Sequence, residues 1–299
     1  MVICLTQCKR LSAIAIFSLF LALVGGGIAV GDEPKTGTKQ EMSKESYSLL
    51  NPTPNEQLRD LATDRPDKTE SAYTLDAGHL MHETDIVNYT LNQDGGIREE
   101  SFFLLAPNLK VGLTNATDLQ FIYQPYRYDR ERVVATRETQ REVGGGDLVI
   151  RLKTNMWGND GGDTAGALMP YVALPVGGRA LGGDGGVEGG LIVPFALSIT
   201  EEWGLGLMTQ VDILRGAENG DYYAQWVNTA SVSRSLFGPV SGYAEMFVAT
   251  SHQQDPVITV DSGLTWMVGP HTQLDAGINV GVTEEADDLN PFVGLSQRF

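Results

Sequence analysis

Apolar and polar residues alternate with a period of two along most of the chain. From 274 to 282 every even position is aliphatic and every odd position is polar or glycine. The segments 147–156 and 203–213 show similar alternation. Successive side chains of a strand point to opposite faces, so the pattern predicts strands with one apolar and one polar face. We predict twelve strands, at residues 79–91, 100–113, 118–128, 146–157, 164–174, 186–198, 203–214, 222–234, 240–250, 256–267, 272–282 and 291–299.

Strand length and the distribution of aromatic residues indicate whether the apolar faces contact lipid or a protein core. Strands of soluble sandwiches usually run about five or six residues, whereas tilted strands that cross a bilayer need about ten. Aromatic residues gather towards the ends of the predicted strands, as at Tyr89, Trp157, Trp203 and Trp266. We therefore expect the apolar faces to contact lipid and the polar faces to line a lumen; a soluble sandwich would instead bury the apolar faces.

The connections between the predicted strands alternate in length. An even number of strands returns both termini to one side, where single-chain outer-membrane barrels have short turns. Short connections are expected at 114–117, 199–202, 235–239 and 268–271, and longer loops at 129–145 and 176–185. The predicted fold is all-β: a transmembrane, antiparallel, up-and-down β-barrel of about twelve strands with a disordered N-terminal lead.

The N-terminus has the features of a secretion signal. Lys9 and Arg10 precede an uncharged run over 11–30 that ends in small residues, which predicts a cleaved signal peptide over 1–31. An uncleaved helical anchor is the alternative. Residues 32–75 form a polar periplasmic lead and possible plug segment, and 76–299 the barrel. The two cysteines, Cys4 and Cys8, both fall within the predicted signal peptide.

Net charge and composition exclude two classes of protein. The chain carries 21 basic and 38 acidic residues, a formal charge of −17, which argues against nucleic-acid binding. After the N-terminal run no apolar stretch approaches the roughly 20 residues of a helical span, so a polytopic helical membrane protein is excluded.

Charged residues in the middle of the predicted strands are candidates to line the lumen. They are Arg151, Lys153, Glu188, Asp212, Glu245, Asp261 and Asp275. These charges could line a conducting pore or form salt bridges that only stabilise a closed barrel. Just before the first strand, Asp64, Arg65 and Asp67 could form a plug by pairing with lumen charges. Arg65 could pair with Asp275 or Glu245, and Asp64 or Asp67 with Arg151 or Lys153. A solvated tether is the alternative for this segment.

Several motifs resemble a known family. They are Thr63-Asp64-Arg65-Pro66-Asp67, Asn155-Met156-Trp157-Gly158-Asn159-Asp160-Gly161-Gly162, Ala167-Leu168-Met169-Pro170, Val187-Glu188-Gly189-Gly190-Leu191 and Asp287-Asp288-Leu289-Asn290-Pro291-Phe292. In combination they resemble the outer-membrane transporter family named for the MetA-pathway of phenol degradation, from about residue 60 to the end. The resemblance implies a barrel in the outer membrane of a Gram-negative-type bacterium that moves small, aromatic or hydrophobic molecules.

The chain ends on an amphipathic strand with a terminal aromatic, Phe299. This resembles the signal by which outer-membrane barrels are recognised for assembly. The expected partners are therefore outer-membrane lipid, a small-molecule solute and the barrel assembly machinery, the last through Phe299. No nucleic-acid partner is expected.

Sequence motifs for catalysis and metal binding are weak. His79, His82 and Glu83 form a His/Glu cluster, but positions 79 and 82 of a strand face opposite ways, so no metal site is expected. No cofactor is expected either. A barrel-embedded lipid-modifying enzyme could use His252, although its neighbour Ser251 would face away from it. The predicted function is a non-enzymatic channel for passive movement of small molecules, with a non-conducting structural or surface-interaction barrel and a barrel enzyme as alternatives.

Overall fold

The computed structural model describes residues 44–177, 186–216 and 220–299. The predicted signal peptide lies outside these residues, as do the first part of the lead and most of the predicted 176–185 loop. None of the helices among the described residues is long and apolar enough to cross a bilayer.

The described residues form fourteen strands after two short 3-10 helices, η1 (Lys44–Ser46) and η2 (Asn55–Gln57). The strands are β1 (Leu80–Asp94), β2 (Ile97–Thr114), β3 (Thr117–Tyr123), β4 (Tyr126–Val133), β5 (Thr139–Gly144), β6 (Leu148–Trp157), β7 (Thr164–Leu174), β8 (Glu188–Ser198), β9 (Trp203–Arg215), β10 (Tyr222–Phe237), β11 (Val240–Ser251), β12 (Val257–Gly269), β13 (Thr272–Gly281) and β14 (Leu289–Arg298).

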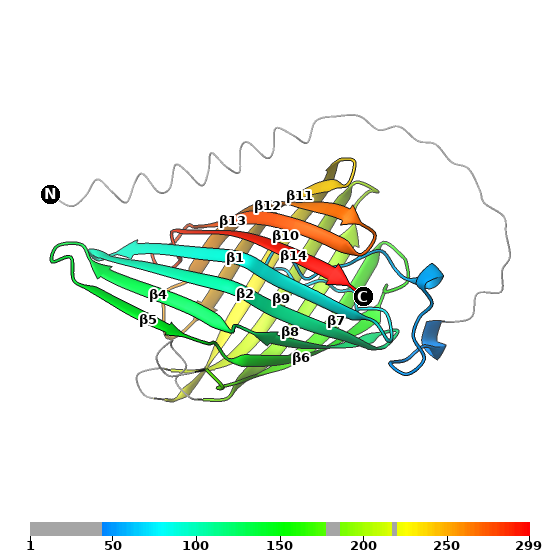
Figure 1. The fold of residues 1–299 in the computed structure, drawn as a ribbon, viewed down its shortest axis with the longest axis horizontal. Coiled ribbons are helices and arrows are strands. Elements are labelled where there is room, and N and C mark those ends of the chain that lie inside the picture. The colour runs from blue at the N-terminus through cyan, green and yellow to red at the C-terminus, as the bar shows by residue number, and fades with distance from the viewer. Residues whose placement is uncertain (1–43, 178–185, 217–219) are drawn as a thin grey trace.

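The sheet closes on itself. Strand β1 pairs antiparallel with β2 on one side and with β14 on the other, and the remaining neighbours pair in turn around the cylinder (Figure 1). Twelve strands, β1–β3 and β6–β14, make the closed wall. Closure leaves the wall without a free edge, which a sheet in a bilayer requires. The predicted twelve-stranded antiparallel barrel is confirmed.

The remaining two strands, β4 and β5, correct one prediction. Residues 129–145 were expected to be a loop, but much of this segment is strand, because β4 pairs with the first half of β2 and β5 pairs with β4. Strand β3 pairs with the second half of β2 and with β6. Charges occupy both faces of this hairpin, so its sequence lacks apolar alternation, yet backbone pairing to β2 still makes it a strand.

The β1–β2 hairpin is longer than predicted. Its strands extend to Asp94 and from Ile97, joined by Gly95 and Gly96 with φ of 54° and 84°. Two consecutive positive φ angles are those of a tight hairpin turn, and glycine adopts them without strain. The β1–β2 and β4–β5 hairpins extend together towards the left of Figure 1.

The set of alternate side chains that points into the lumen changes partway along β1 and β2. The register of β1 against β14 shifts by one residue between Asp85 and Val87, which is a β-bulge, and Leu105, at the same level of β2, has φ 51°. One inserted residue reverses which side chains face inwards. Even positions of β2 therefore face the lumen near its periplasmic end, and odd positions do so near its other end.

The outer wall is apolar. Exposed aliphatic side chains alternate along the strands with residues that face inwards; examples are Leu191, Leu207, Ile213, Leu264, Ile278 and Val293. Exposed aromatic residues lie near the strand ends: Trp157, Trp266 and Phe237 near the end that holds the C-terminus, and Tyr222 and Trp226 near the other. An apolar band between aromatic girdles is the outer surface of a membrane barrel.

The lengths of the connections between strands indicate which end of the barrel faces the periplasm. Connections at the C-terminal end are short, as between β2 and β3, whereas the opposite end has longer loops, as between β7 and β8. Short turns are periplasmic in barrels of this kind. Strand β1 starts, and β14 ends, at the periplasmic end.

Candidate functional site in the barrel lumen

An extended segment precedes β1 and crosses the inside of the barrel. We call residues 59–76 the strap. Among the described residues, its side chains make ion pairs with six wall strands, β1, β2, β6, β12, β13 and β14, and hydrogen bonds with β11. The strap carries many charged residues, and they pair with opposite charges on the polar faces of the surrounding strands.

Asp64 is the centre of a buried ionic cluster. Its Oδ2 lies 2.5 Å from Lys110 Nζ, and its Oδ1 contacts Lys153 Nζ. Gln120 donates to Oδ2 over 3.2 Å, and the Asp64 backbone N–H donates to Glu83 Oε1 over 3.0 Å. Burial alone would raise the pKa of Asp64, but the two ammonium groups together hold it well below its ordinary value. The carboxylate is therefore ionised at neutral pH.

Arg65 bridges two acids on the wall. Its guanidinium Nη2 lies 2.8 Å from Asp275 Oδ1, and its Nη1 lies 2.7 Å from Asp85 Oδ1. It also stacks 5.6 Å from the centre of the Phe292 ring. A Cβ at Gly294 would lie 2.0 Å from the guanidinium, so this position of β14 has no room for a side chain.

Lys68 and Thr69, further along the strap, bind β11 and β12. Lys68 Nζ lies 3.2 Å from Asp261 Oδ2, and the Lys68 backbone N–H donates to Glu245 Oε2 over 2.8 Å. The Thr69 hydroxyl donates to the other oxygen of Glu245 over 2.6 Å. Both oxygens of Glu245 therefore accept hydrogen bonds from the strap.

Two further acids of the strap are half-buried against the wall. Glu70 pairs with Arg151 on β6; burial raises the pKa of Glu70, and Arg151 offsets part of that rise. Among the residues that the structure describes, no cation pairs with Asp67. Burial raises its pKa to about 6, although a hydrogen bond to Ser231 opposes the shift. Asp67 therefore titrates near neutral pH.

Arginines hold both ends of the strap, residues 59 and 76, at the periplasmic end of the barrel. Arg298 Nη1 on β14 lies 3.3 Å from Asp76 Oδ2, and Arg59 Nε lies 3.2 Å from Asp76 Oδ1. Arg59 also reaches Asp160 Oδ1, over 3.3 Å, in the β6–β7 turn. Both ends of the strap are thus held by wall residues of the periplasmic half.

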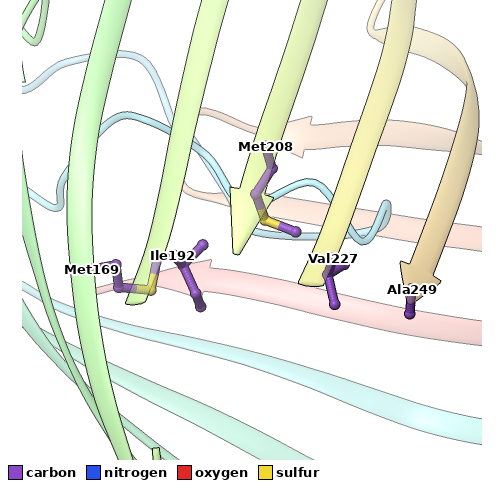
Figure 2. Close-up of a cluster of buried hydrophobic side chains, with 5 residues drawn as sticks. All are labelled: Met169, Ile192, Met208, Val227 and Ala249. Atoms are coloured by element: carbon purple, nitrogen blue, oxygen red, sulfur yellow. The ribbon is translucent and has the colours of Figure 1, made fainter. Parts of the chain in front are cut away.

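A row of apolar side chains crosses the lumen wall on β7–β11, on the extracellular side of the residues of these strands that contact the strap, such as Ala167 and Thr229. Five side chains from the successive strands β7–β11 lie side by side in a row across the wall (Figure 2): Met169, Ile192, Met208, Val227 and Ala249. We call them the apolar stripe. Tyr171, Phe247 and Val257 pack against it, and its members are between 0% and 6% exposed. The lumen is therefore narrow at this level.

Each mouth of the barrel contains a cavity. The extracellular one, about 540 Å³, is lined among others by Thr90, Glu99, Phe103, Asp129 and Asp287. The periplasmic one, about 310 Å³, lies between the strap and the β6–β7 turn. The strap and the apolar stripe separate them.

The seven lumen candidates from the sequence divide by their contact with the strap. Five make ion pairs or hydrogen bonds with it: Arg151, Lys153, Glu245, Asp261 and Asp275. Glu188 instead accepts from the Arg215 backbone N–H over 2.8 Å, and Asp212 accepts from the Tyr171 hydroxyl. The expected contacts of Arg65 with Asp275 and of Asp64 with Lys153 are both present.

Sequence analysis missed Lys110 and the role of Glu83. Lys110 is 3% exposed and lies between Leu109 and Val111 on β2. That alternation was a usable signal, because a charge between two outward-facing aliphatic residues must face the lumen.

The residues considered for catalysis and metal binding have other partners. The imidazole of His79 contacts the carbonyls of Thr53 and Phe299, and Glu83 pairs with Lys110. Within the described parts of the chain, no three His, Cys, Asp or Glu side chains are grouped as metal ligands. His252 contacts Gln253 and the edge of the Tyr223 ring.

Phe299 follows the last strand at the periplasmic end. Its backbone N–H donates to the Leu80 carbonyl over 2.8 Å, and its side chain is 65% exposed. Recognition of this residue by the assembly machinery stays a prediction.

Comparison with known families bears on this arrangement. The model of the family described as "Putative MetA-pathway of phenol degradation" matches residues 63–299. The chain belongs to this family. The matched region begins within the strap, so this phenol-degradation family model covers most of the strap as well as the barrel.

A solved membrane channel has a similar fold. An outer membrane channel from Pseudomonas putida F1 is similar with a TM-score of 0.59 and 11% identity, covering 79% of this chain and 99% of that one. The NanC porin is similar with a TM-score of 0.47 and 8% identity, covering 73% and 98%. No curated protein sequence matches the chain. The closed barrel and the family together place the chain in the outer membrane of a Gram-negative-type bacterium.

Proposed function

We propose that the protein is a passive outer-membrane channel for small molecules, in which the strap narrows the lumen. The observation that carries the proposal is the division of the lumen between the strap cluster and the apolar stripe, with a cavity at each mouth. A barrel of twelve strands is wider than those filled by wall side chains alone and smaller than open porins. The strap occupies the extra space.

The two levels of the lumen favour a class of solute. A molecule that crosses the lumen meets the hydrogen-bonding groups of the strap level and the side chains of Met169, Ile192 and Met208 at the stripe level. Small amphipathic molecules, including aromatic alcohols, can interact with both levels. The family description, which names phenol degradation, supports the same class.

The alternative is a non-conducting barrel. The strap's ion pairs would then only stabilise the wall, and the near-complete burial of the apolar stripe would close the lumen.

Electrical recording in planar lipid bilayers distinguishes the two. The refolded full chain should give discrete single-channel currents, and vesicles containing it should take up a phenol-sized aromatic alcohol faster than a sugar. Heat-modifiable migration on gels checks that the barrel is folded in each preparation. A folded barrel that stays electrically silent would contradict the channel.

A further inference from the structure

The extracellular part of the wall carries opposite charges on its two faces. On β2, β4 and β5 the inward positions hold four acids and one arginine: Glu99, Asp129, Glu131, Glu142 and Arg127. The outward positions hold four arginines and one acid: Arg98, Arg130, Arg132, Arg141 and Glu100. We call these four arginines the arginine patch. It is a concentration of positive charge in a chain whose formal charge is −17.

Hydrogen bonds fix which face is which. The Asn290 amide of β14 donates to Asn88 Oδ1 and Thr90 Oγ1 inside the lumen. Asn88 pairs with Phe103 and Thr90 with Ser101, so odd positions of β2 face inwards here. Even positions, including those of Arg98 and Glu100, therefore face outwards.

Like charges oppose each other across the strands of the arginine patch. Arg98 pairs in register with Arg132, and Arg130 with Arg141. Glu100 binds Arg98 over 2.9 Å and Arg130 over 3.0 Å, whereas Arg132 and Arg141 make no ion pair within the described residues. Like charges directly opposite each other in a sheet are destabilising, so a bound anion would relieve this repulsion.

An apolar groove lies directly beside the arginine patch, on the membrane side. It has a volume of about 680 Å³ and is lined chiefly by Phe102, Leu104, Leu105, Tyr126 and Tyr128, together with the ion pair of Glu100 and Arg130. The groove lies where Leu105, at φ 51°, faces Pro125, at the break between β3 and β4. Tyrosines near the ends of barrel strands mark the membrane interface. The arginines beyond them therefore lie at the level of the lipid headgroups.

We propose that the groove and the arginine patch bind one phosphorylated glycolipid of the outer leaflet, of the lipid A class. Its phosphate would accept hydrogen bonds from the patch, since guanidinium groups bind phosphate in bidentate fashion. One of its acyl chains would lie in the groove against Leu104 and Leu105. Charge complementarity selects an anion, and the adjoining apolar groove selects an anion that carries an acyl chain. A soluble phosphate would satisfy only the first.

Native mass spectrometry of the detergent-solubilised full chain tests the proposal. Wild-type protein should retain added bisphosphorylated lipid A. The triple variant Arg130→Gln, Arg132→Gln and Arg141→Gln should bind it about tenfold more weakly or worse, since charge-assisted hydrogen bonds are lost. Arg127→Gln is the matched control, because it removes an arginine from the inward face of the same strand, and it should leave lipid binding unchanged.

A second measurement needs no variant. Wild-type protein should bind lipid A from which both phosphates have been removed about tenfold more weakly, and excess inorganic phosphate should fail to displace the intact lipid. Equal binding of the phosphorylated and dephosphorylated lipids would overturn the proposal. So would equal losses in the triple variant and in Arg127→Gln, or displacement of the lipid by inorganic phosphate alone.

Discussion

Two neighbouring levels of the lumen, the strap level and the apolar stripe, are built from the same kind of strand but differ in chemistry. At the strap level, β1, β2, β6 and β12–β14 present charges that pair with the strap, and β10 and β11 add hydrogen bonds. The strands β7–β11 present the apolar stripe. A charge in a barrel lumen needs a partner or water, whereas an apolar side chain needs only neighbours. The strap therefore lies where the wall offers charges and hydrogen bonds, whereas the side chains of the apolar stripe pack against one another.

Removing the central acid of the strap should have the largest effect. Asp64→Ala leaves the ammonium groups of Lys110 and Lys153 close together without their shared carboxylate. Breaking a buried ion pair costs about 3–5 kcal/mol, so the strap should detach and trypsin should cut after Lys68. Asp60→Ala is the control, because Asp60 is an exposed strap residue and its loss should change stability by no more than about 0.5 kcal/mol. Equal protection of both variants would count against the strap cluster.

The second largest effect contrasts lipid and lumen at adjacent positions of β13. Arg at Ile278, which faces lipid, should lower the free energy of unfolding by about 2–4 kcal/mol. Arg at Asn279 should cost much less, because that side chain faces the lumen and hydrogen-bonds to Asn290. Denaturant unfolding in lipid vesicles measures both, and the reverse order would mean that the faces are assigned inside out.

A smaller effect is expected from the apolar stripe. Ile192→Gln replaces an aliphatic contact for a passing solute, worth about 1 kcal/mol or a factor of about five in aromatic flux. Ile192→Val keeps the apolar character and should change flux by less than about twofold. Uptake of an aromatic alcohol and of a sugar into vesicles checks the contrast. If both fluxes fall equally in Ile192→Gln, the stripe acts only as a steric wall.

The smallest effect concerns pH. The pKa of Asp67 rises from an ordinary 3.8 to about 6 when the strap is docked, so docking favours the protonated form. That contribution is complete below the ordinary pKa and is lost as pH rises through about 6. Trypsin cleavage of the strap should therefore increase between about pH 5 and pH 7 in the wild type, and this part of the increase should vanish in Asp67→Asn.

The fold was largely predictable from the sequence, because alternation over about ten residues records which face meets lipid. The β4–β5 hairpin was missed for the same reason: both of its faces carry charge, so only its pairing with β2 makes it a strand. The bulge of β1 between Asp85 and Val87 was also hidden, since one inserted residue leaves no pattern of its own.

The strap cluster was only partly predictable. The charges of residues 63–70 indicated partners in the lumen, and an ion pair such as that of Arg65 with Asp275 could be expected because the two side chains carry opposite charges. The sequence could not show that Asp64 is shared between Lys110 and Lys153, because those residues come from strands brought together only by barrel closure. The apolar stripe was missed because its members occupy lumen positions that were expected to be polar.

The most direct test replaces strap residues 60–72 with a flexible Gly-Ser linker of the same length and measures single-channel conductance. If the strap narrows the lumen, conductance should rise clearly above that of the wild type while the barrel stays heat-modifiable on gels. Unchanged conductance in a correctly folded barrel would contradict the strap as the constriction.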